Sequence, residues 1–267
     1  MAKNGYTKPT PKSGKRVRKI LITQPRPDSD RSPYFELARR FEVQMDFHPF
    51  ISLEPIPAKE FRKQKVDIPG YTGVIFTSRN AIDHFFRICE EMRVPVSQET
   101  KYFCISEAVA LYLQKFILYR KRKVFFAAEG TNRSLFDVIN RHKANEKFLY
   151  PCSENQQDNE IVGWLKAGKY DFSTPYMYRT ISNDLRHLQV ENEFDVICFF
   201  TPSGVKSLFD NFPTFAQNGK FIGAFGNNTS RAIEDAGLSL HIKAPEPQVP
   251  SMVAALDRFL REMNGSR

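Results

Sequence analysis

The sequence lacks the patterns that mark most metal centres and disulfide frameworks. Its four cysteines, Cys89, Cys104, Cys152 and Cys198, form no Cys-x-x-Cys pair, and its five histidines show no metal-binding spacing. Cys104 and Cys198 fall inside apolar segments of strand length. We therefore expect structural thiols in a reducing compartment and no metal site.

Long hydrophobic runs and nucleotide-binding loops are also missing. The longest apolar runs have the length of a strand, and the basic N-terminus lacks the apolar core of a secretory signal. We therefore expect a cytoplasmic protein with no membrane partner. The segment GAFGNN at Gly223 has neither the GxGxxG spacing nor the acidic partner of a dinucleotide site, and no phosphate-binding P-loop is present. Catalysis would have to use backbone N–H groups, hydroxyls and a phenol.

Net charge is concentrated at the N-terminus. The chain carries +9, and the seven lysines and arginines before residue 20 have no acid among them, which leaves about +2 for the rest. We interpret residues 1–17 as a disordered basic tail and expect no nucleic-acid partner. The other interpretation, nucleic-acid binding through this tail and the run Tyr119–Lys123, predicts an affinity that falls with salt and disappears with residues 1–18. That run either holds phosphates or carboxylates or is a solvated connection.

Alternating segments define the fold class. With 267 residues, 41% of them hydrophobic and 26% charged, the chain is long enough for one large or two ordinary domains. Strand-like and helix-like segments alternate throughout, which predicts an α/β fold with parallel sheets covered on both faces. Residues 51–57 and 173–182 are extended and marked by proline, as segments that cross between domains need to be.

One strand–turn–helix segment organises the chain. Residues 195–209, DVICFFTPSGVKSLF, combine a buried strand, a turn of small residues and a helix. Pro202 suits the first helical turn, and Thr201 can cap the helix. The turn therefore presents free N–H groups at a helix N-terminus, where anions bind.

The same pattern occurs earlier in the chain. Residues 73–86, GVIFTSRNAIDHFF, align without gaps on the segment that ends at residue 209, at a constant offset of 123. Residues 101–113 align on 221–233 at an offset of 120, which pairs Ser106 with Gly226. Two recurring units predict two similar α/β domains. The alternative is chance similarity between buried strands.

Seven motifs in order resemble the uroporphyrinogen-III synthases of tetrapyrrole biosynthesis. They extend from Lys19 to the final helix and read LITQPRPDS, VIFTSRNAI, YPCSEN, YMYRT, FFTPSGV, GAFGNNTSRAIEDAGL and APEPQVPSMVAAL. The resemblance implies two similar three-layer α/β/α domains with parallel sheets, duplicated and intertwined, joined by two extended crossing segments. One domain would hold residues 18–50 and 183–267. The other would hold residues 51–182, with crossings at about 51–57 and 173–182.

The resemblance also implies a reaction. Enzymes of this family are lyases that close hydroxymethylbilane, a linear tetrapyrrole octacarboxylate, into uroporphyrinogen III while inverting ring D through a spiro intermediate. This implies no cofactor and a monomer that serves haem or sirohaem synthesis. Helix N-termini with short polar side chains suit the carboxylates, and two domains can hold the flexible chain in the geometry of the spiro route.

Site residues follow from the same resemblance. Tyr178 matches the linker tyrosine and would donate a proton or a hydrogen bond to the departing hydroxyl. It could instead pack between the linkers, and Tyr176 is a neighbouring competitor. The substrate contacts carried over by position are Thr77, Ser78, Asn80, Ser106, Thr201, Pro202, Ser203, Gly204, Asn227, Asn228 and Thr229. Helix capping explains the same residue types and is compatible with binding.

Two turns depart from the family pattern. Ser106 stands where glycine is usual, and Glu107 would place a negative charge near a polyanion unless it faces the helix dipole instead. Asn227-Asn228 replaces a Pro-Thr pair. This replacement is tolerable because asparagine can adopt positive φ and can cap a helix. The alternative function is a non-catalytic relative that binds a tetrapyrrole or another polyanion for regulation. Retention of Tyr178 and of both serine-bearing turns favours the enzyme.

Overall fold

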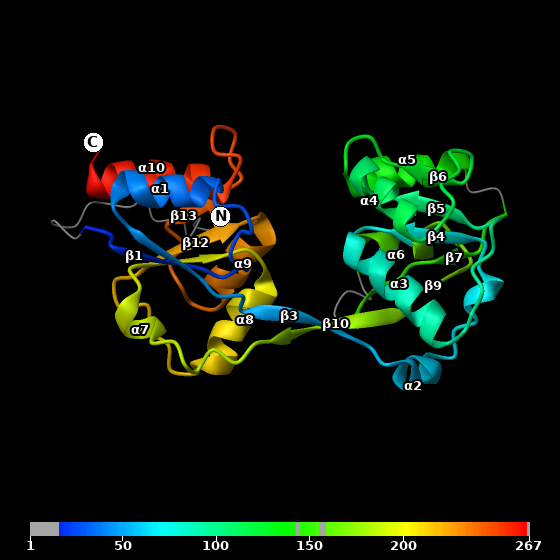
Figure 1. Cartoon of the computed structure of the whole chain (residues 1–267), viewed down its shortest axis with the longest axis horizontal. Helices are drawn as coiled ribbons and strands as arrows, with labels where there is room; N and C mark the ends of the chain where they lie inside the picture. The colour runs from blue at the N-terminus through cyan, green and yellow to red at the C-terminus, as the bar shows by residue number, and fades with distance from the viewer. Residues whose placement is uncertain (1–15, 143–144, 155–158, 266–267) are drawn as a thin grey trace. The chain divides into compact units, whose positions relative to one another are not determined.

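The computed structural model describes residues 16–142, 145–154 and 159–265. The chain divides into two compact units: the first combines the chain up to Ser52 with the chain from Ile181 onward, and the second is Leu53–Thr180 (Figure 1). The chain passes between them in β3 (Ile51–Pro55) and β10 (Tyr176–Ser182). These strands are neighbours in a three-stranded sheet that β8 (Cys152–Ser153) completes.

A five-stranded parallel sheet forms the centre of the first unit, in the order β13-β12-β11-β1-β2. Its strands are β1 (Lys19–Ile22), β2 (Gln44–Phe47), β11 (Val196–Phe199), β12 (Phe221–Phe225) and β13 (Ile242–Ala244). Its helices are α1 (Pro33–Phe41), α7 (Val190–Glu193), α8 (Pro202–Asn211), α9 (Asn227–Asp235) and α10 (Met252–Asn264). Successive residues of β1 point to opposite faces. Ile20 and Ile22 pack with α1 and α10, whereas Leu21 packs with α8 and α9.

The second unit has a sheet of the same size, in the order β6-β5-β4-β7-β9. Its strands are β4 (Gly73–Phe76), β5 (Lys101–Cys104), β6 (Val124–Phe126), β7 (Phe148–Leu149) and β9 (Phe172–Ser173). Its α-helices are α2 (Ala58–Phe61), α3 (Arg79–Glu91), α4 (Glu107–Tyr112), α5 (Asn132–His142) and α6 (Glu160–Ala167), with 3-10 turns at Arg62–Gln64, Ile68–Gly70 and Leu113–Lys115. Val74 and Phe76 pack with α3 and α4, and Ile75 packs with α5 and α6.

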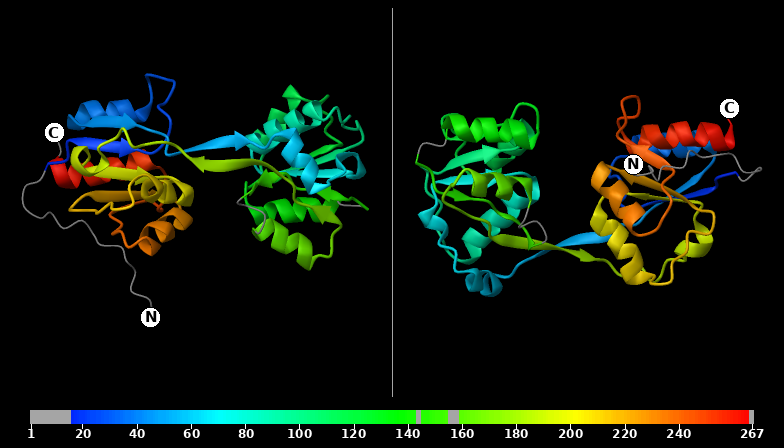
Figure 2. Two further views of the ribbon diagram at one scale, coloured as in Figure 1. Left: turned by 90° about the horizontal axis from the view of Figure 1, so that it is seen from below. Right: turned by 180° about the vertical axis from the view of Figure 1, so that it is seen from behind.

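The predicted fold class is confirmed. All strand pairs within the two five-stranded sheets are parallel. Each sheet has helices on both faces, as the two further views show (Figure 2). Strands buried on both faces explain the continuous apolar runs VIF and VICFF in the sequence. All four cysteines are buried and form no disulfide.

The sequence repeat corresponds to a structural repeat. Strand β4 ends at Phe76 and α3 begins at Arg79, while β11 ends at Phe199 and α8 begins at Pro202, which preserves the offset of 123. Helices α4 and α9 begin at Glu107 and Asn227, which preserves the offset of 120. Chance similarity between buried strands is therefore excluded as the explanation.

The expected N-terminal tail needs correction. Residues 1–15 of the predicted tail lie outside the described residues, but Val17 is only 1% exposed and is not part of a tail. Its N–H donates to Asn264 Oδ1 and its carbonyl accepts from Asn264 Nδ2, both at 2.9 Å. Strand β8 was not predicted, since two residues carry no periodicity.

Candidate active site

The candidate residues lie at the carboxyl ends of parallel strands. In the second unit the chain builds β4, β5 and β6 in one direction and then adds β7 and β9 on the other side of β4. The edge beyond β4 and β7 is therefore a topological switch point, where open α/β sheets bind ligands. The first unit has its own switch point between β1 and β11.

Thr77 and Ser78 form the turn that follows β4. Ser78 has an extended backbone (φ −155°, ψ 160°), and its hydroxyl accepts a 3.1 Å hydrogen bond from the Ala81 N–H, so it caps α3. Asn80, two residues on, is exposed at the surface of the first turn. The two roles foreseen for Ser78, capping and contact with a ligand, are compatible because both side chains of the turn are only half-buried.

Tyr178 lies in β10 next to this turn. It is 7% exposed and its ring stacks on His84, with centroids 4.7 Å apart and an interplanar angle of 19°. Burial raises the pKa of the phenol, hydrogen bonding from Ser78 opposes this shift, and Cys152 and Tyr150 add to it. The phenol is therefore protonated at neutral pH. The structure thus brings together Tyr178, Thr77 and Ser78.

Tyr150 is a second phenol at the switch point, and the sequence reasoning did not select it. It follows β7 directly, is 2% exposed, and accepts a 2.9 Å hydrogen bond from Asn159 Nδ2. Burial raises its pKa, while hydrogen bonding from Thr77 and Asn159 opposes the shift. Thr77 therefore contacts Tyr150, and Ser78 contacts Tyr178. Tyr150 lies in the motif YPCSEN, one of the seven that resemble the family, and this motif could have pointed to it.

His84, on the second turn of α3, was also missed. Burial lowers the pKa of its imidazole, the Arg87 guanidinium lowers it further, and Asp83 partly compensates. Its Nδ1 atom is buried and has no hydrogen-bond partner among the residues that the structure describes. A neutral ring that stacks on Tyr178 restricts the rotation of the phenol. Position 84 has no feature in the sequence that separates it from an ordinary helix residue.

Ser106 occupies the equivalent turn after β5. Its hydroxyl accepts from the Val109 N–H at 3.4 Å and caps α4. Glu107 is exposed in the first turn of this helix. A carboxylate there is favourable for the helix dipole. The turn thus has a structural role that does not depend on a ligand.

The corresponding turn of the first unit follows β11. Thr201 caps α8 by accepting from the Gly204 N–H at 3.1 Å, as predicted, and Pro202 is the first helical residue. Pro202 is exposed, Ser203 is half-buried, and Gly204 is buried. A Cβ atom at Gly204 would lie 3.4 Å from Thr201 Oγ1 and 3.9 Å from Thr23 Oγ1.

Thr23 follows β1 and so completes this switch point. It is 6% exposed, and its hydroxyl donates to the Cys198 carbonyl at 2.9 Å, which ties β1 to β11. Thr23 lies in the motif LITQPRPDS, and no role was predicted for it from the sequence.

The turn after β12 differs from the expectation. Gly226, with φ +88°, is the N-cap residue of α9, and no side chain caps this helix. Neither asparagine needs to supply the positive φ or the cap, because Gly226 occupies the N-cap position and Asn227 is already helical. Asn227 and Asn228 are exposed, whereas Thr229 is 2% exposed. A ligand at this turn would meet the two asparagines, and Thr229 packs inside the unit.

Hydroxyls and helix N-terminal N–H groups are thus the chemical groups of both switch points, and the switch point of the second unit adds two phenols. Among residues 16–142, 145–154 and 159–265, no three His, Cys, Asp or Glu side chains gather as metal ligands do. Within the same residues, no helix has the length and apolar character needed to cross a bilayer. Such groups bind carboxylates and transfer protons.

Comparisons with known proteins are consistent with this arrangement. The chain resembles uroporphyrinogen-III synthetase from Helicobacter pylori, at 17% identity and a TM-score of 0.58, with 92% of this chain and 100% of that chain covered. It also resembles a mutant uroporphyrinogen III synthase from Thermus thermophilus, at 14% identity and a TM-score of 0.56, with 92% and 98% covered. These likenesses show the fold. A family model described as uroporphyrinogen-III synthase HemD matches residues 32–254, and the chain therefore belongs to the uroporphyrinogen-III synthase family of tetrapyrrole biosynthesis.

Proposed function

We propose that this protein converts hydroxymethylbilane to uroporphyrinogen III with inversion of ring D, without a cofactor, as a cytoplasmic monomer. The observation that carries the proposal is a protonated phenol, Tyr178, that lies beside Ser78 at a switch point of the second unit. Family membership supports the substrate, and the groups at both switch points suit its carboxylates and its hydroxyl leaving group.

The reaction needs an acid only at its start. A proton delivered to the terminal hydroxyl lets it leave as water, and the remaining pyrrole becomes an azafulvene-like cation. Attack by the substituted carbon of ring D forms a spiro intermediate, which fragments and recloses at the free carbon. Loss of a proton restores the aromatic pyrrole, so charge and atoms balance and no oxidant is required.

Tyr178 is the proposed proton donor. Burial keeps the phenol protonated, and contact with Ser78 on one side and His84 on the other limits its orientations. A phenol of raised pKa is a weak acid, and the hydroxyl departs readily, so we assign it about 10²-fold of the rate. The larger contribution is orientation of the bilane.

Carboxylate binding is assigned to the strand-terminal turns. The first-turn N–H groups of α3 and α8 carry the partial positive charge of the helix N-terminus, and Ser78 and Thr201 hold those turns in shape. Asn80, Ser203, Asn227 and Asn228 are accessible there, whereas Gly204 and Thr229 are proposed to act through backbone and packing.

The test is the isomer ratio of the product. The purified protein is supplied with hydroxymethylbilane, and the oxidised products are separated by chromatography. Predominance of isomer III over the symmetric isomer I, which forms unaided, supports the proposal. Formation of isomer I alone, at the protein-free rate, would contradict it, and the non-catalytic tetrapyrrole- or polyanion-binding relative would replace it.

A pair of variants then tests the phenol. Tyr178→Phe should lower the rate of isomer III formation by about 10²-fold. Tyr176→Phe is the matched control on the same strand, where the backbone is held by Gln64 at 3.0 and 2.8 Å. Equal losses in the two variants would assign Tyr178 a packing role.

A further inference from the structure

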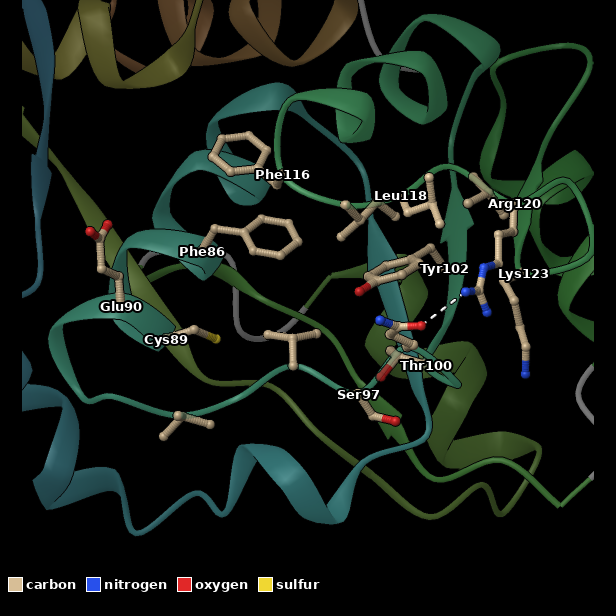
Figure 3. A pocket seen from close by; sticks show the side chains of 15 residues that line it. Phe86, Cys89, Glu90, Ser97, Thr100, Tyr102, Phe116, Leu118, Arg120 and Lys123 are labelled. Atoms are coloured by element: carbon tan, nitrogen blue, oxygen red, sulfur yellow. Dashed lines mark hydrogen bonds between the residues drawn. The ribbon is translucent and has the colours of Figure 1, made fainter.

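The second unit contains a cavity of about 480 Å³ away from the switch point. It lies between the last turns of α3 and the two connections that precede β5 and β6, residues 94–100 and 116–123 (Figure 3). These connections lead into the amino ends of the strands, so the cavity is at the sheet edge opposite Ser78. Its volume is within the range of small-molecule sites.

The walls of the cavity are apolar. Phe86 and Phe116 stack face to face, with centroids 4.6 Å apart and an interplanar angle of 2°. Phe116 is 39% exposed and Leu118 is 74% exposed, although both line the cavity. Large side chains left in water beside a cavity mark a surface that gains free energy when a ligand covers it.

The inner end carries two polar groups. Thr100 is 6% exposed and Tyr102 is 3% exposed, so both are more than nine-tenths buried. Within the part of the chain that the structure describes, neither hydroxyl has a hydrogen-bond partner. Tyr102 points into the ring of lining side chains (Figure 3). A hydroxyl that no protein group bonds remains available to a ligand, and a hydrogen bond formed there is largely shielded from bulk water.

The rim carries two cations, Arg120 and Lys123, and the Glu90 carboxylate also lines the cavity, on the side of Phe86 (Figure 3). Arg120 donates to Gln98 Oε1 at 2.9 Å and lies 3.9 Å from Glu99. Lys123 pairs at 2.7 Å with the same Glu99, whose side chain is 70% exposed. A guanidinium has five N–H donors, so Arg120 retains donors for a ligand after its bond to Gln98. Both cations belong to the run Tyr119–Lys123, which the proposed reaction does not use.

We propose that this cavity binds a small carboxylic acid with a flat apolar body and a hydrogen-bonding group at the far end. The carboxylate pairs with Arg120 at the rim, the body lies against Phe116 and Leu118, and the far group bonds Tyr102. Nucleic acid is not the expected ligand, because the cavity is lined mainly by apolar side chains.

The probe is 6-hydroxy-2-naphthoate, titrated into the full-length protein by calorimetry. We expect one site with a Kd below about 1 mM, where a weak small-molecule site begins. The uncharged alcohol of the same ring system, 2-naphthalenemethanol, should bind at least about tenfold more weakly, because it lacks the charge-assisted bond. No saturable binding, or equal binding of the alcohol, overturns the proposal.

Variants place the probe. Arg120→Gln should raise the Kd about tenfold. Arg122→Gln removes the same charge two residues away, at an exposed position outside the cavity, and should change the Kd less than about twofold. Equal effects of the two substitutions would indicate non-specific attraction to the basic run and would overturn the proposal.

The far contact has its own control. Tyr102→Phe should weaken 6-hydroxy-2-naphthoate about fivefold and leave 2-naphthoate, which lacks the hydroxyl, unchanged. Tyr178→Phe should affect neither probe, because that phenol is at the opposite edge of the sheet. Loss of binding in Tyr178→Phe would place the probe at the switch point and contradict the assignment.

Discussion

The Tyr150 phenol is a structural link at the switch point of the second unit. It joins the turn after β4 to Asn159, the N-cap residue of α6, and so connects two elements that flank the switch point. Tyr150→Phe should lower the free energy of unfolding by about 1–2 kcal/mol, because a buried bond is lost on both sides. Urea denaturation measures this.

Tyr170→Phe is the matched control for Tyr150→Phe. The Tyr170 hydroxyl donates to Asn140 Oδ1 at 2.8 Å, but this bond is exposed, so its loss should cost less than about 0.5 kcal/mol. Equal costs for the two substitutions would show that the buried bonds of Tyr150 stabilise the protein no more than the exposed bond of Tyr170.

The lowered pKa of His84 predicts that the stability of the folded protein depends on pH. Burial lowers the pKa of His84 in the folded protein below the unfolded value of about 6.5. As the pH falls through that value, the unfolded chain takes up a proton that the folded protein does not, so stability decreases. Between pH 7.5 and pH 5.5, His84→Gln should therefore lose less stability than the native protein.

A second histidine limits the change expected in the pH measurement. Burial also lowers the pKa of His241, which contributes in the same direction and is retained in His84→Gln, so the slope should decrease without vanishing. A slope that His84→Gln leaves intact would assign the whole dependence to other groups.

At the scale of elements, two equivalent helix caps allow the capping role of a residue to be distinguished from a role in binding. Thr201 caps α8 and Ser251 caps α10 with the same 3.1 Å bond to the N–H three residues on. Replacement of either by alanine should cost about 1 kcal/mol of stability. Only Thr201→Ala should also slow isomer III formation, by about tenfold, since the first-turn N–H groups of α8 that are proposed to bind a substrate carboxylate lose their support. The same slowing in Ser251→Ala would make capping alone the explanation.

The sequence predicted elements better than the details of their ends. Strand β11 and helix α8 were correctly predicted because a continuous apolar run, a capping threonine and Pro202 all indicate the same boundary. The backbone conformation at the start of α9 could not be predicted, since Gly226 and Asn227 both tolerate positive φ, and only tertiary structure decides which of them adopts it. Tyr150 and His84 depend on contacts between elements distant in sequence, which periodicity does not encode.

At the scale of the whole molecule, the two sheets have one arrangement and different chain orders. The order β13-β12-β11-β1-β2 matches β6-β5-β4-β7-β9 position by position, with β11 in the place of β4. Strands β1 and β2, which begin the first unit, thus correspond to β7 and β9, which end the strand series of the second. The repeat alone suggested tandem halves. Pairing between β1 and β11, 176 residues apart at Ile20 and Val196, excludes them.

The N-terminal boundary of the folded protein gives the last prediction. Deletion of residues 1–15 removes four lysines, Lys3, Lys8, Lys12 and Lys15, and should leave the free energy of unfolding unchanged. Deletion of residues 1–18 also removes Val17, which is buried and hydrogen-bonded to Asn264 at the end of α10. It also removes the backbone hydrogen bonds of Arg18 with Gln44 and Asp195. That deletion should cost at least about 2–3 kcal/mol, the sum of one buried valine and its hydrogen bonds.

The substitution Asn264→Ala tests the same contact in the full-length chain. It removes the side chain that bonds the Val17 backbone and should reproduce about half of the loss, while Val17 stays packed against α10. The two deletions also test nucleic-acid binding: if the tail binds DNA, both truncated proteins should lose a salt-dependent affinity that the full chain has.

Equal stability of the two deletions would place the start of the folded protein after Arg18, in which case the bonds to Asn264 contribute nothing in solution.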